Sequence, residues 1–189
     1  MTLRTDEPRL APLEPPFDAG LGALLDRMNP PGAPGILALF RVLARHPRLA
    51  ERLPAWGGFF LGRHATLPLR DREIVILRVC ARCRAGYEWG VHAAAFGAQA
   101  ALDEAQLRAI ADPASALEVL PERDRLLVRT VDALHDSGTL GDAQWAALAR
   151  GWTEQQCIEL LVLAGWYHAI AYVCNAARVP REGWAAHMP

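Results

Sequence analysis

The sequence predicts an all-α fold, and three observations carry that prediction. Apolar residues recur at helical spacing along most of the chain after residue 16. Proline, glycine and helix-capping residues punctuate these stretches at intervals typical of helices. No segment shows the strict alternation of a strand, and a chain with 52% hydrophobic and 22% charged residues has the composition of an ordinary globular protein.

The chain is expected to form one domain preceded by an arm. Residues 1–16 are rich in proline and charge and have no period, which suggests an N-terminal arm lying on the surface or on a neighbouring subunit. The chain is long enough for one domain with a hydrophobic core or for two small helical lobes that share a core, and we expect one helical domain over residues 17–189.

The first predicted helices cover 17–29, 36–45 and 49–61. Apolar residues repeat every three or four positions in the first two, and the third is moderately helical. Asn29 and the Pro-Pro-Gly that follows it end the first helix. Pro47 ends the second, because the residue before a proline disfavours helical geometry.

The next helix is expected to begin near Pro68, whose missing amide hydrogen costs nothing at a helix start. Gly86 should break or kink the chain, so a new helix would run from Tyr87 to about Ala100. Asp103 is then an N-cap with Gln106 in capping-box position, which opens a short helix.

The last part of the chain is also helical. A helix is predicted over 121–135, followed by a turn at 137–141, and Gly151 closes the segment that comes next. Thr153 and Gln156 have the spacing of a capping box, which predicts a last, very apolar helix from Glu154 to about Ala177.

One short motif occurs twice. Leu67–Glu73 matches Leu120–Leu126, and the Arg-Asp-Arg of both copies is therefore expected to build the same kind of helix start. Glu73 has no counterpart, because the second copy has Leu126 at that position. A carboxylate where the other copy has a core residue is costly unless it has a function.

Glu88 and His92 are spaced to lie on one face of a helix, which is a general acid/base geometry. If the helices before and after Gly86 form a hairpin, Glu73 approaches the same pocket. Tyr87 and Trp89 would supply apolar walls that raise a carboxyl pKa. A Glu and a His at this spacing are more often a solvated surface pair. The aromatic, alanine-rich surroundings and the exception at Glu73 favour a catalytic site.

Cys80 and Cys83 are close enough on a helix to form a redox pair. The alternative is that they are small apolar core residues, because thiols in the middle of a helix lack the N-terminal field that lowers a cysteine pKa. Cys157 and Cys174 do not form a second close pair, so no metal site is expected.

Two histidines stand outside this group. His168 shares a helix face with Tyr172 and is expected either to line the substrate pocket or to be a core histidine with a neighbouring partner. His135 is expected near a helix end, where a positive charge is favoured.

The charge pattern excludes some partners. The net charge is −1 and the basic residues are scattered, so nucleic acid is not expected as a partner. The apolar run 158–173 contains Glu159 and His168 and is shorter than a membrane span, and residues 1–16 do not have the pattern of a signal peptide. We therefore expect a cytoplasmic protein without a membrane partner.

The residues also resemble a known family. The run from Leu67 to Val79, followed by Tyr87-Glu-Trp-Gly-Val-His92, is similar to the carboxymuconolactone decarboxylase family of the alkylhydroperoxidase D-like superfamily. The similarity extends to Phe40–Pro47 upstream and to Trp166–Ala171 with Asn175 downstream. It implies an all-α fold with a helical-hairpin active-site core, homo-oligomers, and a proton relay that includes Glu73 and His92.

The chain departs from that superfamily at one motif. In the alkylhydroperoxidase D branch a Cys-x-x-Cys pair lies between the glutamate and the histidine, and those positions fall here on Ala85 and Glu88. Neither residue replaces a thiolate nucleophile. The sequence therefore resembles the branch without the redox pair.

Three functions remain open. The first is acid/base chemistry by Glu73, Glu88 and His92 on a small organic acid or lactone, for which decarboxylation is a natural reaction and no cofactor is demanded. The second is a thiol peroxidase or reductase that uses Cys80 and Cys83. The third is a non-catalytic helical protein for ligand binding or assembly.

Overall fold

A computed structural model describes residues 7–30, 32–112 and 117–189. Within them the structure has helices and no strand, as the sequence predicts. The helices are α1 (Ala19–Met28), α2 (Ala38–Leu43), α3 (Pro47–Ala50), α4 (Leu53–Leu61), α5 (Leu69–Arg82), α6 (Gly86–Phe96), α7 (Glu104–Ala111), α8 (Glu122–Ser137), α9 (Asp142–Gly151) and α10 (Glu154–Ala177).

The chain forms two compact units. The first unit consists of Met1–Ala65 and Val173–Gly183, and the second of Thr66–Tyr172 and Trp184–Pro189. The last turns of α10 therefore belong to the first unit and the rest of that helix to the second. Each unit is described by itself.

In the first unit, α1 packs against α2 and α4, and α3 connects α2 to α4. The described part of the predicted arm lies on this unit: the backbone amides of Arg9 and Leu10 reach the carbonyl of Ala177. The Leu13 amide donates to the Arg41 carbonyl, and the Arg41 guanidinium returns a bond to Leu13. Residues 1–6 of the arm lie outside the described residues.

The single helix predicted over 49–61 is wrong, because the structure has two helices there. α3 ends at Ala50 and α4 begins at Leu53. Each has a proline in its first turn, Pro47 and Pro54, where the ring fits a helix start and lacks an amide hydrogen to continue the preceding turn.

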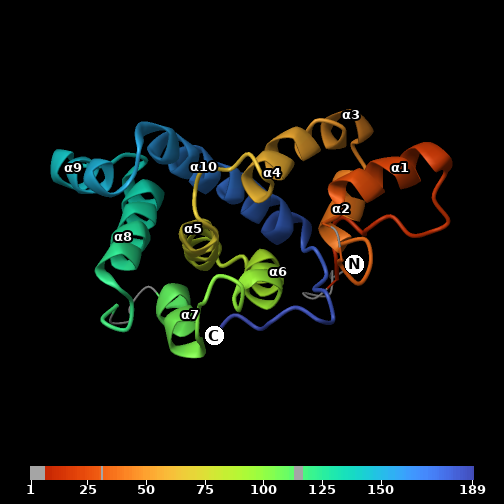
Figure 1. Cartoon of the computed structure of the whole chain (residues 1–189). Helices are drawn as coiled ribbons and strands as arrows, with labels where there is room; N and C mark the ends of the chain where they lie inside the picture. The colour runs from red at the N-terminus through yellow and green to blue at the C-terminus, as the bar shows by residue number, and fades with distance from the viewer. Residues whose placement is uncertain (1–6, 31, 113–116) are drawn as a thin grey trace. The chain divides into compact units, whose positions relative to one another are not determined.

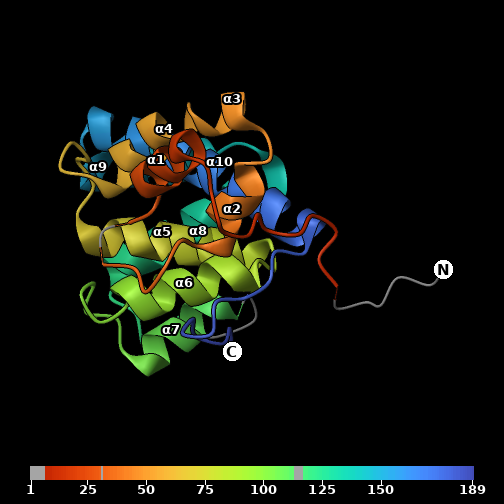
Figure 2. The same cartoon turned by 90° about the vertical axis from the view of Figure 1, so that its right-hand side faces the viewer.

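The second unit is built around α5, which is buried along most of its length from Asp71 to Ala81. It packs against α6, α7 and α8, and α9 packs against α8. Figure 1 shows α5 among these helices, and in Figure 2 α5, α6 and α7 lie one above another. A helix buried on all sides holds its polar side chains away from water, which matters for Glu73.

The repeated motif produces a reciprocal pair of helix starts. Both helices begin directly after a proline, α5 after Pro68 and α8 after Pro121. Arg70 of the first copy binds Asp124 of the second at 2.7 Å, and Arg123 of the second binds Asp71 of the first at 2.8 Å. The two copies thus stabilise each other's helix starts, because the arginine of each copy pairs with the aspartate of the other.

Asp71 also accepts a 2.7 Å hydrogen bond from the indole nitrogen of buried Trp152. We expect Asp71→Ala to lower the free energy of unfolding by about 1–3 kcal/mol, because the indole N–H loses its partner inside the protein. Urea denaturation measures this. Asp26→Ala, at an exposed position of α1, is the control and should change stability by less than about 0.5 kcal/mol. Equal effects of both variants would contradict the role of Asp71.

The chain reverses between α5 and α6 two residues earlier than predicted. Arg84 has a φ of 53°, and the Ala85 amide donates to the Cys80 carbonyl while the Arg84 amide donates to Ala81. This is a Schellman turn with an arginine at the left-handed position that glycine usually occupies. Gly86 is instead the first residue of α6, which ends at Phe96, earlier than the predicted Ala100.

The predicted capping boxes are confirmed. Asp103 and Gln106 exchange bonds at the start of α7, and Thr153 and Gln156 do so at the start of α10. α10 has 24 residues and, by length and composition only, is apolar enough to cross a membrane, so the apolar segment is longer than the sequence run suggested. Core helices pass the same test, and Glu159 in α10 accepts hydrogen bonds from Thr66 and Leu67.

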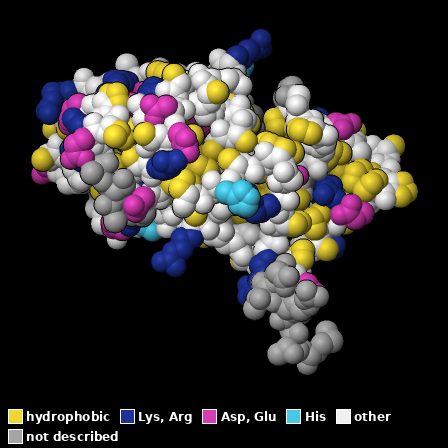
Figure 3. Space-filling model, turned by 90° about the horizontal axis from the view of Figure 1, so that it is seen from below, with side chains coloured by type: hydrophobic (Ala, Val, Ile, Leu, Met, Phe, Trp, Pro, Cys, Tyr) yellow, Lys and Arg dark blue, Asp and Glu magenta, His cyan; other side chains and the backbone are white. Residues whose placement is uncertain are grey.

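Charged side chains of both signs are interspersed on the face drawn in Figure 3. Basic groups do not gather there into the continuous stripe that grips a phosphate backbone.

Candidate active site

His92 lies between an acid and a phenol inside the second unit. Its Nδ1 is 2.8 Å from Oε2 of Glu73, and its Nε2 is 3.0 Å from the hydroxyl of Tyr167. Glu73 comes from α5, His92 from α6 and Tyr167 from α10. Glu73 is 0% exposed and His92 4% exposed, so the three groups meet away from bulk water.

The proton positions follow from the partners. Arg72 donates to the other oxygen of Glu73 at 3.0 Å, which supports the carboxylate form. A carboxylate only accepts hydrogen bonds, so Nδ1 of His92 carries a proton. In the neutral ring Nε2 is then the acceptor, and the Tyr167 hydroxyl donates to it. Glu73, His92 and Tyr167 therefore form a continuous relay.

The relay favours the charged form of His92. Burial by itself lowers the pKa of this ring, but the charge of Glu73, its hydrogen bond and the charge of Glu88 outweigh that effect, so the pKa of His92 is raised above its ordinary value. Arg72 opposes the rise. Burial also raises the pKa of Tyr167 well above its ordinary value, so the hydroxyl keeps its proton.

Glu88 stands beside this relay as a separate acid. It is on α6 and 7% exposed, and its carboxyl makes no hydrogen bond within the described part of the chain. Burial raises the pKa of Glu88, the charge of His92 lowers it, and the charge of Glu73 raises it, with a net rise. A buried carboxyl with a raised pKa is a candidate proton donor.

α6 is held close to the end of the chain at Gly90. The Ala186 amide donates to the Gly90 carbonyl at 3.0 Å. A Cβ atom at residue 90 would lie 2.3 Å from the Ala186 carbonyl oxygen, so only glycine permits this approach. The contact lies between Glu88 and His92 in sequence and helps to fix the helix that carries them.

The predicted pocket walls are buried as well. Tyr87 and Trp89 are both in the core of the second unit. The indole nitrogen of Trp89 is buried and has no hydrogen-bond partner among the described residues. A buried donor without a partner is costly unless a ligand or water accepts a hydrogen bond from it.

A solved structure of an uncharacterized peroxidase-related protein from Silicibacter sp. TM1040 is similar to this chain. The TM-score is 0.79 at 14% sequence identity, and the match covers 97% of this chain and 96% of that chain. The chain has an alkylhydroperoxidase-like fold. No protein-family model matches the sequence, and no curated protein matches it.

The two proposed redox residues have different surroundings. Cys80 is fully buried in α5, near enough to Tyr167 to contribute to its pKa shift. Cys83 is the half-buried C-cap of the same helix. Both are thiols rather than disulfide sulfurs. Burial raises the pKa of Cys83 more than nearby Arg82 lowers it, which disfavours the thiolate that peroxide chemistry needs.

His168, predicted to line the pocket or to be a core histidine, has hydrogen-bond partners other than the three residues of the relay. Its ring is hydrogen-bonded to His135 at 2.9 Å and lies 6.4 Å from Tyr172, measured between ring centroids. His135 is in the last turn of α8 as expected. The expectation that its charge is favoured there is wrong, because burial, Arg82 and His168 lower the pKa of His135.

Sequence reasoning missed Tyr167 and Arg72. Tyr167 belongs to the buried stripe of α10 that also includes Leu160, Leu163 and Ala171. A tyrosine in such a stripe needs a partner for its hydroxyl, and that signal was readable. The role of Arg72 was hidden because the repeated motif has an arginine there in both copies, and Arg125 pairs with Glu122 instead.

Proposed function

We propose that the chain is a carboxymuconolactone decarboxylase-like enzyme that uses acid/base chemistry on a small organic acid or lactone. The observation that carries this proposal is the buried relay of Glu73, His92 and Tyr167, with the buried carboxyl of Glu88, whose pKa is raised, beside it. Two acid/base groups whose pKa values are shifted by burial and by each other are typical of proton-transfer sites.

Each group has a distinct role in the proposal. Glu73 fixes the tautomer of His92 and stabilises its positive charge, as a carboxylate does for a catalytic imidazole. His92 as imidazolium attracts a substrate carboxylate or a developing enolate. Glu88 is the proton donor.

Decarboxylation balances with these groups alone. A substrate carboxylate loses carbon dioxide and leaves a carbanion stabilised by a neighbouring carbonyl. The Glu88 carboxyl gives its proton to that carbon and becomes a carboxylate. Glu88 then takes one proton from solvent, so the net reaction consumes one proton and releases carbon dioxide and the protonated product.

The test of Glu88 is a substitution that keeps its shape. Carboxymuconolactone, the compound from which the resembling family takes its name, and other small carboxylic acids with a β-carbonyl or lactone ring are the probes, with carbon dioxide release as the readout. We expect Glu88→Gln to lower turnover by at least about 100-fold, because glutamine has no acidic proton to give.

The matched control is Glu104→Gln, at an exposed position of α7, which should keep the full rate. The thermal stability of Glu88→Gln should be equal to or above that of the wild type. Burial of an ionisable carboxyl is unfavourable, and the neutral amide does not carry this cost. Near-normal turnover of the Glu88 variant on a substrate that the wild type converts would overturn the role of Glu88.

A thiol peroxidase is the second candidate, because the similar solved structure is described as peroxidase-related. In this case a thiolate of Cys80 or Cys83 attacks the peroxide, releases alcohol or water, and the resulting sulfenic acid condenses with the second thiol. Thiol titration after addition of a hydroperoxide separates the candidates. The peroxidase requires loss of two thiols per chain, and the acid/base enzyme requires no loss.

We also propose a cytoplasmic homo-oligomer. The second unit has exposed apolar side chains at Trp145 on α9 and at Ile158 on α10, and Ile158 is 62% exposed. Apolar groups of this size at the surface are typical of subunit contacts when they cluster. Light scattering on the full chain measures the number of subunits.

A further inference from the structure

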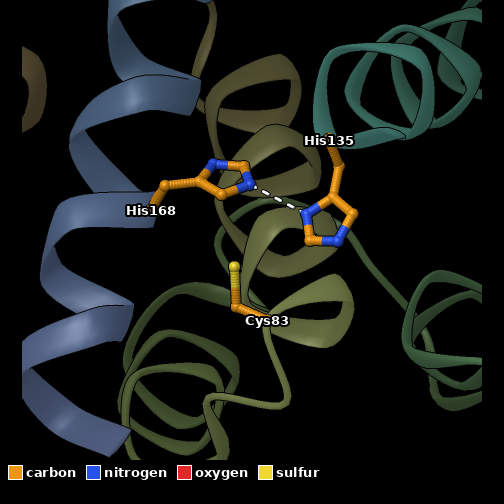
Figure 4. A group of neighbouring side chains, drawn as sticks. All are labelled: Cys83, His135 and His168. Atoms are coloured by element: carbon orange, nitrogen blue, oxygen red, sulfur yellow. Dashed lines mark hydrogen bonds between the residues drawn. The ribbon is translucent and has the colours of Figure 1, made fainter. Parts of the chain in front are cut away.

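A second group of reactive side chains lies on the same unit, outside the relay. Cys83 at the end of α5, His135 in the last turn of α8 and His168 in α10 bring their ligand atoms together, and these atoms all lie within 4.8 Å of one another. Figure 4 shows the two rings facing each other and the Cys83 sulfur directed toward the space beside them. The three residues are each half-buried.

The orientation of His168 leaves a lone pair for a ligand. Its Nδ1 is 2.8 Å from the Ala164 carbonyl, and a carbonyl only accepts, so Nδ1 carries the proton. In the neutral ring Nε2 then has no hydrogen, and this atom points at His135, whose Nδ1 lies 2.9 Å away. A backbone carbonyl that holds the far nitrogen is how metal-binding histidines are commonly oriented.

The charges around the group are balanced. Arg82 is the nearby cation and would by itself repel a metal ion, but it is paired with Asp132 and with Asp136. His135 presents its Nδ1 to Nε2 of His168, and this nitrogen coordinates an ion in the tautomer of the ring that has its proton on Nε2. The thiol of Cys83 would exchange its proton for the metal.

The spacing suits a small tetrahedral ion once the two nitrogens and the sulfur, which lies within 4.8 Å of them, adjust around it. Zinc binds histidine nitrogen at about 2.0–2.1 Å and cysteine sulfur at about 2.3 Å, which places ligand atoms about 3.3–3.7 Å from one another. The two nitrogens, 2.9 Å apart, need to separate by a few tenths of an ångström, and the hydrogen bond between them is replaced by two bonds to the ion.

We propose that Cys83, His135 and His168 bind one divalent transition-metal ion of the zinc class, with a fourth position for water. One thiolate and two imidazoles form a ligand set suited to zinc, and three protein ligands with an open position are usual for a reactive zinc site. The site was not predictable from the sequence, because the three ligands come from three helices. The ion would join the ends of α5 and α8 to α10.

The first experiment uses the full chain, purified without a histidine tag and freed of metal with a chelator. Isothermal titration with Zn²⁺ should show one site per chain. Titration with Co²⁺ should give a tetrahedral spectrum with a thiolate-to-cobalt charge-transfer band, which reports a cysteine ligand without any mutation. A wild-type protein that gives neither signal would overturn the proposal.

Three substitutions assign the ligands: Cys83→Ser, His135→Gln and His168→Gln. Each should weaken Zn²⁺ binding by more than about 100-fold. Loss of a residue that only hydrogen-bonds to a metal ligand already weakens binding by up to about 100-fold, and loss of a ligand itself should weaken it more. Cys83→Ser should also remove the charge-transfer band.

Cys157→Ser and His64→Gln are the controls and should keep both signals, since neither residue belongs to the group. Equal binding by the wild type and the Cys83 and His168 variants would place the metal elsewhere and refute the site. Circular dichroism checks that each variant is folded.

Discussion

Replacing Glu73 with glutamine is expected to lower turnover by about 10²–10⁴-fold, the range seen when a catalytic imidazole loses its orienting carboxylate. An amide can present its NH₂ group to Nδ1 of His92, which selects the wrong tautomer. It also removes the negative charge that raises the pKa of His92. The variant tests the relay more directly than removal of His92, because the ring and its packing stay in place.

The same variant has a readout that needs no substrate. The pKa of His92 can be followed by NMR of the ring protons, with His92→Gln to assign the signal. It should fall in Glu73→Gln, because burial lowers this pKa and the charge of Glu73 no longer raises it. Glu122→Gln, an exposed acid on α8, should leave it unchanged. An unaltered His92 titration in the Glu73 variant would show that the two side chains do not interact in solution.

The raised pKa values also set the pH dependence of stability. Folding raises the pKa of His92, so the folded state holds a proton that the unfolded state releases. The stabilisation is complete below the ordinary histidine pKa and is lost as the pH rises through the raised value. Glu88 has the same sign in a lower window that starts at the ordinary glutamate pKa. In Glu73→Gln the histidine part of this loss should move to lower pH.

The largest loss of stability is expected from Asp132→Ala, at about 3–5 kcal/mol in the free energy of unfolding. Arg78 is 1% exposed in the middle of α5, and Asp132 binds it through two 2.7 Å contacts. The Ile110 carbonyl is a further partner of Arg78, but it carries no charge. Without Asp132 the guanidinium is left inside the second unit with no carboxylate bound to it among the described residues. Urea denaturation measures the change.

A double variant separates the unpaired charge from lost packing. Arg78→Met together with Asp132→Ala removes both charges, and it should recover a large part of the stability lost in the single variant. A single variant that loses less than about 1 kcal/mol, or a double variant that is less stable than the single one, would show that the pair does not hold α5 to α8.

Much of the helical architecture was predictable because its signals are local. The capping residues Asp103 and Thr153 fixed the starts of α7 and α10, and the repeated motif fixed those of α5 and α8. The errors occurred where backbone geometry departs from propensity. Arg84 adopts a left-handed conformation that favours glycine, so the neighbouring Gly86 was the natural but wrong choice for the break.

The candidate site was predictable only in part. Glu73 was found because it breaks the internal repeat, and His92 because of its spacing from Glu88. The apolar stripe of α10 indicated that Tyr167 needs a hydroxyl partner, but spacing along one helix does not reveal that this partner is His92 on another helix. The same reason hid the approach of Cys83 to His135, because three helices must pack before the side chains meet.

The exchanged pairs Arg70–Asp124 and Arg123–Asp71 imply a division of labour between two similar segments. Each segment holds the other in place. Only the first copy continues into an acid, Glu73, that contacts the imidazole of His92. Because each ion pair joins the two segments, a substitution of either aspartate would affect the starts of both helices. The segment without a catalytic acid therefore constrains the segment that carries Glu73. Redesign of the substrate preference should therefore leave these four residues untouched and vary the positions around Glu88.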